Sequence, residues 1–284
     1  MNVGYFVSDA FTVARRNLIK IKRVPDLLVF TTLQPIMFVL LFGFVFGSAI
    51  GGIAGGDGGD GSSYREFMMA GIFAQTIVFG ATLTGYGMAE DMQKGIIDRF
   101  RTLPMHPSSV LFGRTISDVA NNVIVLVVMS ATGLAIGWRI HGGVLDAVLA
   151  YALMLLFAYA VSWVMAFVGL VVRAPEIVNN ASFIVVFPMT FIANTFVPAE
   201  NLPATLRTVA GWNPVSTITH AARDNFGNLG ALKDPTLTAE QMRSRIEYTW
   251  ALEHAELYTL IWVVVLLMVF IPLATRQYRR AVAR

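Results

Sequence analysis

Six long apolar stretches, separated mostly by short polar connections, set the pattern of this 284-residue sequence. The hydrocarbon core of a bilayer is about 30 Å thick, and a helix of about 20 apolar residues crosses it. The sequence therefore predicts six transmembrane helices, at residues 27–50, 67–89, 110–137, 144–172, 177–197 and 257–275. Six spans place both termini on one side of the membrane.

The residues before the first span follow a different pattern. Apolar side chains recur there every three or four positions, as in an amphipathic helix, at Phe6, Val7, Ala10, Phe11, Ala14, Leu18 and Ile21. We expect residues 1–25 to form a helix in the membrane interface that ends at Pro25. The alternative is an amphipathic helix packed on a partner protein. A cleaved signal peptide is not expected, because its apolar core is only about 7–15 residues long.

Composition and charge agree with a membrane protein and indicate its orientation. Hydrophobic residues make up 56% of the chain and charged residues 14%, which excludes a soluble globular protein. Lys and Arg near span ends stay in the cytoplasm, and here they gather in the N-terminal segment, after the second span and in the C-terminal tail. Both termini are therefore expected in the cytoplasm. A net charge of +3 is too small to indicate a nucleic-acid partner.

Enzymatic chemistry has little support in the sequence. It contains no cysteine and no HExxH motif, and its four histidines fall in connections or at span ends. The glycine-rich connection 51–61 lacks both the Gly-Lys-Ser/Thr of a P-loop and the ligand spacing of an EF-hand. We therefore predict no catalytic, cofactor-binding or metal-binding residues. Any ATP-driven work requires another polypeptide, which would hold the ATP and its Mg²⁺.

Polar residues inside the spans are mostly neutral, and the ionisable ones lie near span ends. Arg114 and Asp118, for example, are four residues apart and pair on one helix face. Ion-coupled carriers place ionisable residues deep in their spans, so this pattern favours helix packing or a large amphiphilic substrate. Two helix faces are candidates for a substrate path, with ordinary packing as the alternative: Gln34, Phe38 and Phe42 in the first span, and Phe183, Phe187, Thr190 and Asn194 in the fifth.

The connection at residues 90–104 is dense in charges and ends at a proline. A solvated turn is one interpretation. The other is a short helix on the membrane surface whose apolar side chains dock in the groove of a partner. Its anchors would be Ile96, Ile97, Phe100 and Leu103, with Asp98, Arg99 and Arg101 at the rim.

With this connection included, the sequence resembles permease subunits of the ABC-2 exporter family over nearly its whole length, and is most similar to the daunorubicin-resistance type of drug exporter. The resemblance rests on an ordered set of motifs: Lys94-Gly95, Asp98-Arg99-Phe100-Arg101, Phe187-Pro188-Met189-Thr190-Phe191, Phe196-Val197-Pro198 and Trp212-Asn213-Pro214-Val215. It implies that residues 90–104 form a cytoplasmic coupling helix, in which Glu90, Lys94 and the anchor and rim residues contact an ABC ATPase subunit. It also implies extracytoplasmic or re-entrant helices within 198–256, and a pair of permeases, identical or homologous, with two ATPase subunits.

These observations together predict a single all-α domain over residues 1–284, embedded in the lipid of the cytoplasmic membrane with six spans. The expected function is that of the permease subunit of an ATP-driven exporter for an amphiphilic or hydrophobic compound, such as a drug or lipid. Two alternatives stay open: a membrane-anchored assembly protein without transport, and an ion-coupled carrier.

The charge distribution predicts that Lys94 faces the cytoplasm, whereas Asp57 and Lys233 lie outside. Because the chain has no cysteine, single cysteines at these positions can be labelled in intact cells with a membrane-impermeant maleimide. We expect labelling at positions 57 and 233, and none at position 94 until the cells are opened. Labelling of Lys94→Cys from outside would show that the predicted topology is wrong.

Overall fold

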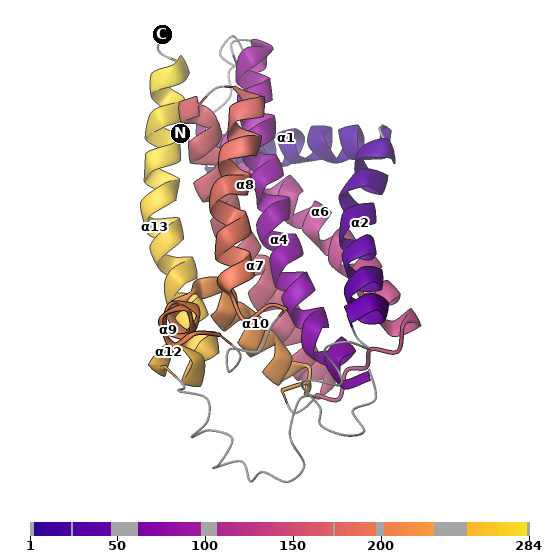
Figure 1. Cartoon of the computed structure of the whole chain (residues 1–284). Coiled ribbons are helices and arrows are strands. Elements are labelled where there is room, and N and C mark those ends of the chain that lie inside the picture. Colours follow the sequence, from indigo (N-terminus) through magenta and orange to yellow (C-terminus); the bar gives the residue numbers. More distant parts are fainter. Residues whose placement is uncertain are drawn as a thin grey trace.

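The computed structural model describes residues 3–23, 25–46, 62–97, 107–172, 174–196, 202–229 and 249–282, and every regular element in this part of the chain is a helix. Five long helices form one bundle (Figure 1): α4 (Ser62–Gln93), α6 (Pro107–Ala135), α7 (Val144–Val172), α8 (Pro175–Ile192) and α13 (Ala255–Val282). Each is long and apolar enough to cross a membrane. Five of the six predicted spans are thereby confirmed.

The predicted first span, 27–50, differs from the other five. Its described part consists of α2 (Pro25–Leu40) and the π-helical turn η1 (Leu41–Phe46). The apolar helical part, Thr32–Phe44, is shorter than the other spans. Residues 47–50 lie outside the described part of the chain. The structure thus supports a shorter apolar helix here.

The N-terminal helix α1 (Val3–Arg23) lies across the bundle, at the end where α13 finishes (Figure 1). It buries Ala10, Val13 and Ala14 where it packs on α6. Phe11, on another face, is 70% exposed. The segment is thus one helix that crosses the bundle, and its place in the membrane interface stays a prediction.

The fifth span ends earlier than predicted, at Ile192 rather than at residue 197. A bend at residues 193–196 follows it, and three short helices then gather at the opposite end of the bundle from the termini (Figure 1): α9 (Ala204–Trp212), α10 (Pro214–Asn225) and α12 (Trp250–Glu253). We call this the far end. The helix stops early because the bend is bound by side chains of α4 and α10, as described below.

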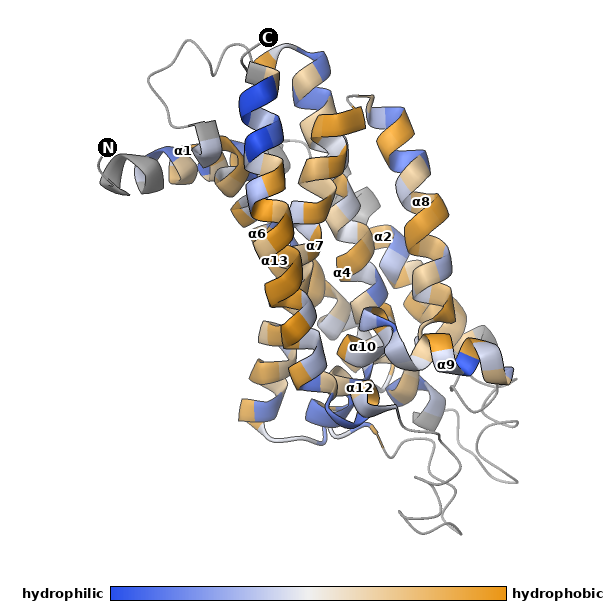
Figure 2. Cartoon of the chain, turned by 90° about the vertical axis from the view of Figure 1, so that its left-hand side faces the viewer, coloured by the Kyte–Doolittle hydropathy of each residue, from blue (hydrophilic) through white to orange (hydrophobic). Residues whose placement is uncertain are grey.

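The core between the spans is apolar and rich in aromatic rings. Around Phe226, where α10 ends, the ring centroids of Trp138, Tyr151 and Phe73 lie at 5.3, 5.2 and 6.0 Å. Edge-to-face pairs of this kind contribute about 1 kcal/mol each beyond their buried area. Hydrophobic residues fill the middle of the bundle, whereas hydrophilic ones gather at the C-terminal end of α13 (Figure 2).

Candidate functional site

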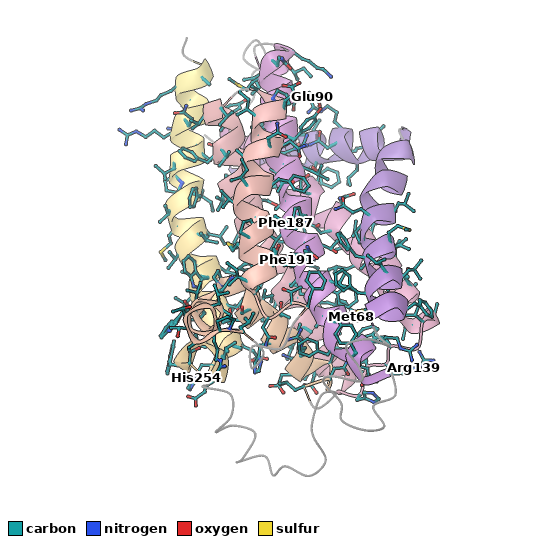
Figure 3. All side chains as sticks on the ribbon, in the orientation of Figure 1. Met68, Glu90, Arg139, Phe187, Phe191 and His254 are labelled. Atoms are coloured by element: carbon teal, nitrogen blue, oxygen red, sulfur yellow. The ribbon has the colours of Figure 1, made fainter. Side chains whose placement is uncertain are left out.

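The predicted coupling segment begins as the last turn of α4. Glu90 lies at the termini end of the bundle (Figure 3), and Lys94 Nζ donates to its Oε1 at 2.6 Å. This hydrogen bond and the charge of Glu90 raise the pKa of Lys94, so the ammonium group stays protonated at neutral pH. The chain then turns at Gly95, whose φ of 64° favours glycine. The predicted contacts Asp98, Arg99, Phe100 and Arg101 lie outside the described residues.

Ile97 has a different environment from the one predicted. Its side chain is 3% exposed and belongs to a core cluster of this chain that includes Met88, Leu111 and Tyr278. The structure therefore turns Ile97 into the bundle, while Ile96 beside it is half-buried. Burial of Ile97 anchors the start of the coupling segment to the spans.

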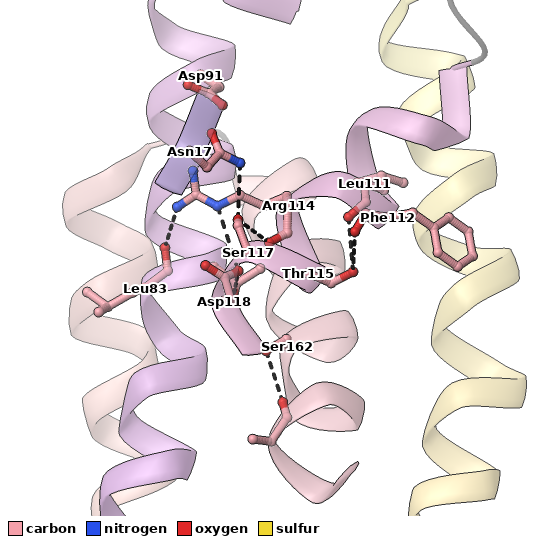
Figure 4. A network of polar contacts seen from close by, with 12 residues as sticks. Asn17, Leu83, Asp91, Leu111, Phe112, Arg114, Thr115, Ser117, Asp118 and Ser162 are labelled. Carbon is pink, nitrogen blue, oxygen red and sulfur yellow. Dashed lines mark hydrogen bonds and ion pairs between the residues drawn. The ribbon is translucent and has the colours of Figure 1, made fainter. Parts of the chain in front are cut away.

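Next to this segment, polar residues of α1, α4 and α6 form a connected set, most of which is labelled in Figure 4. We call it the termini-end network: Arg16, Asn17, Thr84, Asp91, Arg114, Ser117 and Asp118. Asp118 Oδ2 accepts a hydrogen bond from Thr84 Oγ1 at 2.6 Å and lies 3.7 Å from Arg114 Nε. Asn17 Nδ2 donates to Ser117 Oγ at 3.2 Å. Arg16 Nη2 lies 3.6 Å from Asp91 Oδ2. The network joins the interface helix to both spans that flank the coupling segment.

Gly87 makes room for the arginine of this network. A Cβ atom at position 87 would overlap the Arg114 guanidinium, which also donates from Nη2 to the Leu83 carbonyl at 3.3 Å. The side chains of Arg114 and Asp118 are only 15% and 16% exposed. Removing one partner of a pair so shielded from water leaves an uncompensated charge. Both residues of the pair belong to α6, and α6 is joined to α4 where Asp118 accepts from Thr84 and Arg114 donates to the Leu83 carbonyl.

At the far end, Arg223 of α10 binds both α4 and the bend after α8. Its Nε donates to the Phe67 carbonyl at 2.8 Å, and its Nη2 donates to the Thr195 carbonyl at 3.1 Å. The guanidinium also stacks on the Phe67 ring, 3.5 Å from the centroid, and the side chain is 2% exposed. Tyr64 of α4 donates its hydroxyl to the Phe196 carbonyl at 3.3 Å. Carbonyl groups beyond the end of α8 thus find donors within the protein.

Asn213 ties the start of α10 to the last turn of α8. Its Oδ1 accepts from the Val215 N–H at 2.9 Å and caps α10, while its Nδ2 donates to the Met189 carbonyl at 2.7 Å. Sequence reasoning assigned no role to Asn213 or Arg223. An Asn followed by a Pro is typical of the start of a helix, so the start of α10 could be predicted. Nothing in the sequence indicates which carbonyl groups the Asn213 and Arg223 side chains bind.

The two predicted faces of the substrate path meet through Phe196. Consecutive rings form what we call the aromatic stripe: Phe38, Phe42, Phe196, Phe191 and Phe187, with centroid separations of 6.0, 4.4, 5.6 and 4.9 Å. The stripe runs from α2 and η1 to α8. Phe187 and Phe191 are 43% and 49% exposed and lie about midway along the bundle (Figure 3). Phe183 is also exposed, and its ring centroid lies 5.3 Å from that of Phe79 on α4.

Other predicted path residues lie apart from this stripe. Thr190 is fully buried, and its hydroxyl donates to the Val186 carbonyl at 2.9 Å. Asn194 lies beyond the end of α8, where its backbone N–H donates to Ser216 Oγ at 3.2 Å. Gln34 is exposed on α2. The structure thus brings the aromatic residues together and leaves the polar ones separate.

These groups suit mechanical contact and amphiphile binding better than bond chemistry. They offer aromatic rings, amides, hydroxyls and guanidinium groups. Among the residues that the structure describes, no group of three or more His, Asp or Glu is placed to hold a metal ion.

The fold and these sites define a multi-pass membrane protein in which a charged connection is fixed to the spans on both sides. The chain belongs to the ABC-2 type transporter family, whose family model matches residues 9–226. It is 33% identical to the daunorubicin resistance ABC transporter permease protein DrrB1 of Streptomyces coeruleorubidus, over 77% of this chain and 75% of that protein. It is 29% identical to the doxorubicin resistance ABC transporter permease protein DrrB of Mycobacterium tuberculosis, over 42% of this chain and 41% of that protein.

A more distant relative is the putative transport permease ycf38 of Porphyra purpurea, 23% identical over 78% of this chain and 75% of that protein. Within its family, this chain is a permease, the membrane subunit of the transporter. The termini-end network and the aromatic stripe therefore lie in the part of a transporter that crosses the membrane.

The Arg114–Asp118 pair can be tested by a double-mutant cycle. Asp118→Ala should destabilise the purified protein by about 2–3 kcal/mol, because it leaves the Arg114 charge in a shielded site. Arg114→Met with Asp118→Ala should cost less than the sum of the single changes, with a coupling energy of about 1 kcal/mol or more. Chemical unfolding in detergent measures both. Glu176→Ala, at an exposed position on α8, is the control and should change stability by less than about 0.5 kcal/mol. Additive single changes would show that Arg114 and Asp118 do not stabilise each other.

Proposed function

We propose that this chain is the transmembrane half of an exporter that moves an amphiphilic or hydrophobic compound outward across the cytoplasmic membrane. A permease of this family implies a partner ATPase subunit, and ATP hydrolysis there supplies the energy. The complex contains two permeases, this chain twice or this chain with a homologue. Two of the relatives are named for resistance to daunorubicin and doxorubicin, which supports a drug-like or lipid-like cargo.

The aromatic stripe carries this proposal. Rings from the first and fifth spans form one row of contacts through the buried Phe196, and on α8 about half of the Phe191 side chain is exposed. Such rings accept planar or aliphatic groups of varied shape through dispersion and stacking. A surface of this kind suits a compound with a large apolar part better than it suits an ion.

Energy transfer from the ATPase needs a rigid connection, since a change driven in one subunit reaches another only through contacts that differ between two states. We assign this role to residues 90–104. Ile97 fixes the segment to the core, and the termini-end network fixes α4 and α6 to each other and to α1. A displacement of the segment would therefore move the flanking spans together.

Substitutions in the aromatic stripe should change substrate preference. Phe187→Ala and Phe191→Ala should alter which compounds stimulate ATP hydrolysis by the assembled complex, because each removes an exposed ring, while assembly stays intact. Ile184→Ala is the matched control, since Ile184 is 75% exposed on the same helix. If both Phe variants rank the compounds by stimulation of ATP hydrolysis as the unchanged protein does, or if the control shows the same change, the stripe only packs the helices together.

Truncation of the proposed anchor should break the connection to the ATPase. Phe100→Ala should weaken binding of the ATPase subunit by about 2 kcal/mol or more, as for a central interface residue, or leave it bound with hydrolysis that no longer drives export. Membrane insertion should be normal, and Met105→Ala, just beyond the segment, should leave both activities unchanged. Co-purification and export assays measure the two effects. If Phe100→Ala and Arg99→Glu both leave binding and export unaltered, residues 90–104 are a solvated turn.

A further inference from the structure

A hollow of about 520 Å³ lies at the far end, between the last turn of α8 and α9. It is an open depression lined by Met189 and Ile192 of α8, by Thr208, Val209 and Trp212 of α9, and by Asn213 and Pro214 where α10 begins. Small-molecule sites in proteins commonly have volumes of about 300–1,000 Å³ and mostly apolar walls. The hollow therefore has the size and lining of a site for one small molecule.

The walls of the hollow are held in place by three elements. Asn213 Nδ2 binds the Met189 carbonyl at 2.7 Å and so joins the two sides of the hollow. Tyr258 of α13 donates its hydroxyl to the Trp212 carbonyl at 3.0 Å, and Thr249 Oγ1 donates to the Gly211 carbonyl at 2.8 Å. A site fixed in this way loses little conformational freedom when a ligand binds.

The surroundings of α9 indicate where the hollow opens. α9 lies across the bundle (Figure 2) and exposes Leu206, Val209 and Trp212. Beside it, Tyr258 has Trp212, Trp250 and Trp262 as ring neighbours at 6.0, 6.3 and 6.4 Å. Clusters of Trp and Tyr mark the boundary between lipid and water. The hollow thus opens beside the lipid, near the membrane surface at the far end.

We propose that this hollow binds the apolar ring or chain of a neutral amphiphile as the compound leaves the protein. Methyl, thioether and indole groups contact the apolar part, while the Thr208 hydroxyl and the Asn213 amide meet its polar end. Met189 and Ile192 belong to the same last two turns of α8 as Phe187 and Phe191 but lie on other sides of the helix, so the hollow lies beside the surface assigned to the substrate. The assignment of an exit site rests on the proposed export function.

Occupancy can be measured with a single cysteine in this Cys-free chain. The permease carrying Val209→Cys, assembled with its ATPase in phosphatidylcholine vesicles, is treated with N-ethylmaleimide with and without the neutral aromatic probe N-phenyl-1-naphthylamine. At a probe concentration of about twice its Kd, two thirds of the sites are filled, so labelling should slow about threefold. Val264→Cys on α13, with 46% exposure against 56% at Val209, is the control and should label at an unchanged rate. Thr208→Trp, which fills the hollow, should abolish protection at position 209.

The outcomes separate the site from the export function. An unchanged labelling rate at position 209 overturns the site, even if the probe stimulates ATP hydrolysis and export therefore stands. Protection at position 209 without any stimulation supports a binding site and counts against its role in export. Disulfide cross-linking between two Val209→Cys chains, with no effect of the probe, would show that a second copy fills the hollow and would overturn the proposal.

Discussion

A bilayer offers no water to a backbone carbonyl, so each polar group that a helix leaves free at membrane depth needs a partner inside the protein. α8 ends after 18 residues, and the bend beyond it exposes such carbonyls within the bundle. Arg223 and Tyr64 donate to two of them, and Asn213 donates to Met189 in the last turn. This requirement places α10 against α4. Because α9 joins α10 at Asn213, it also sets the position of α9 and of the hollow beside it.

The same constraint gives α4 its central place, since arginines from three other elements bind it. Arg16 of α1 pairs with Asp91, Arg114 of α6 donates to the Leu83 carbonyl, and Arg223 of α10 donates to the Phe67 carbonyl. A guanidinium group carries several donors in a rigid plane, so one side chain can join two backbones at once. Along its length, α4 therefore connects the coupling segment at one end to the α8–α10 junction at the other.

Hydropathy and periodicity predicted five of the six spans, because burial in lipid acts on each helix separately. They failed where the outcome depends on contacts between distant residues. Thr190 was grouped with Phe187 because the two lie three residues apart, yet the hydroxyl is turned inward to its own helix backbone. Ile97 had the pattern of a partner anchor, but its position beside Leu111 and Tyr278 buries it. Arg223 counted only as a positive charge in a connection, since nothing local shows that its partners are Phe67 and Thr195.

Arg223 also constrains the order in which the protein is made. It is 156 residues away from Phe67 in sequence but only 28 from Thr195, so α4 is made long before this donor exists, whereas the bend after α8 precedes it by a short segment. Until Arg223 is made, the carbonyl groups of this bend can accept hydrogen bonds only from lipid headgroups, water or the insertion machinery. Domains form from the N-terminus onward during synthesis, and here the helix that completes the far end arrives after four of the five long spans. A nascent chain that stops before residue 223 therefore carries four of the five long spans without the contact that joins α4 to the bend after α8.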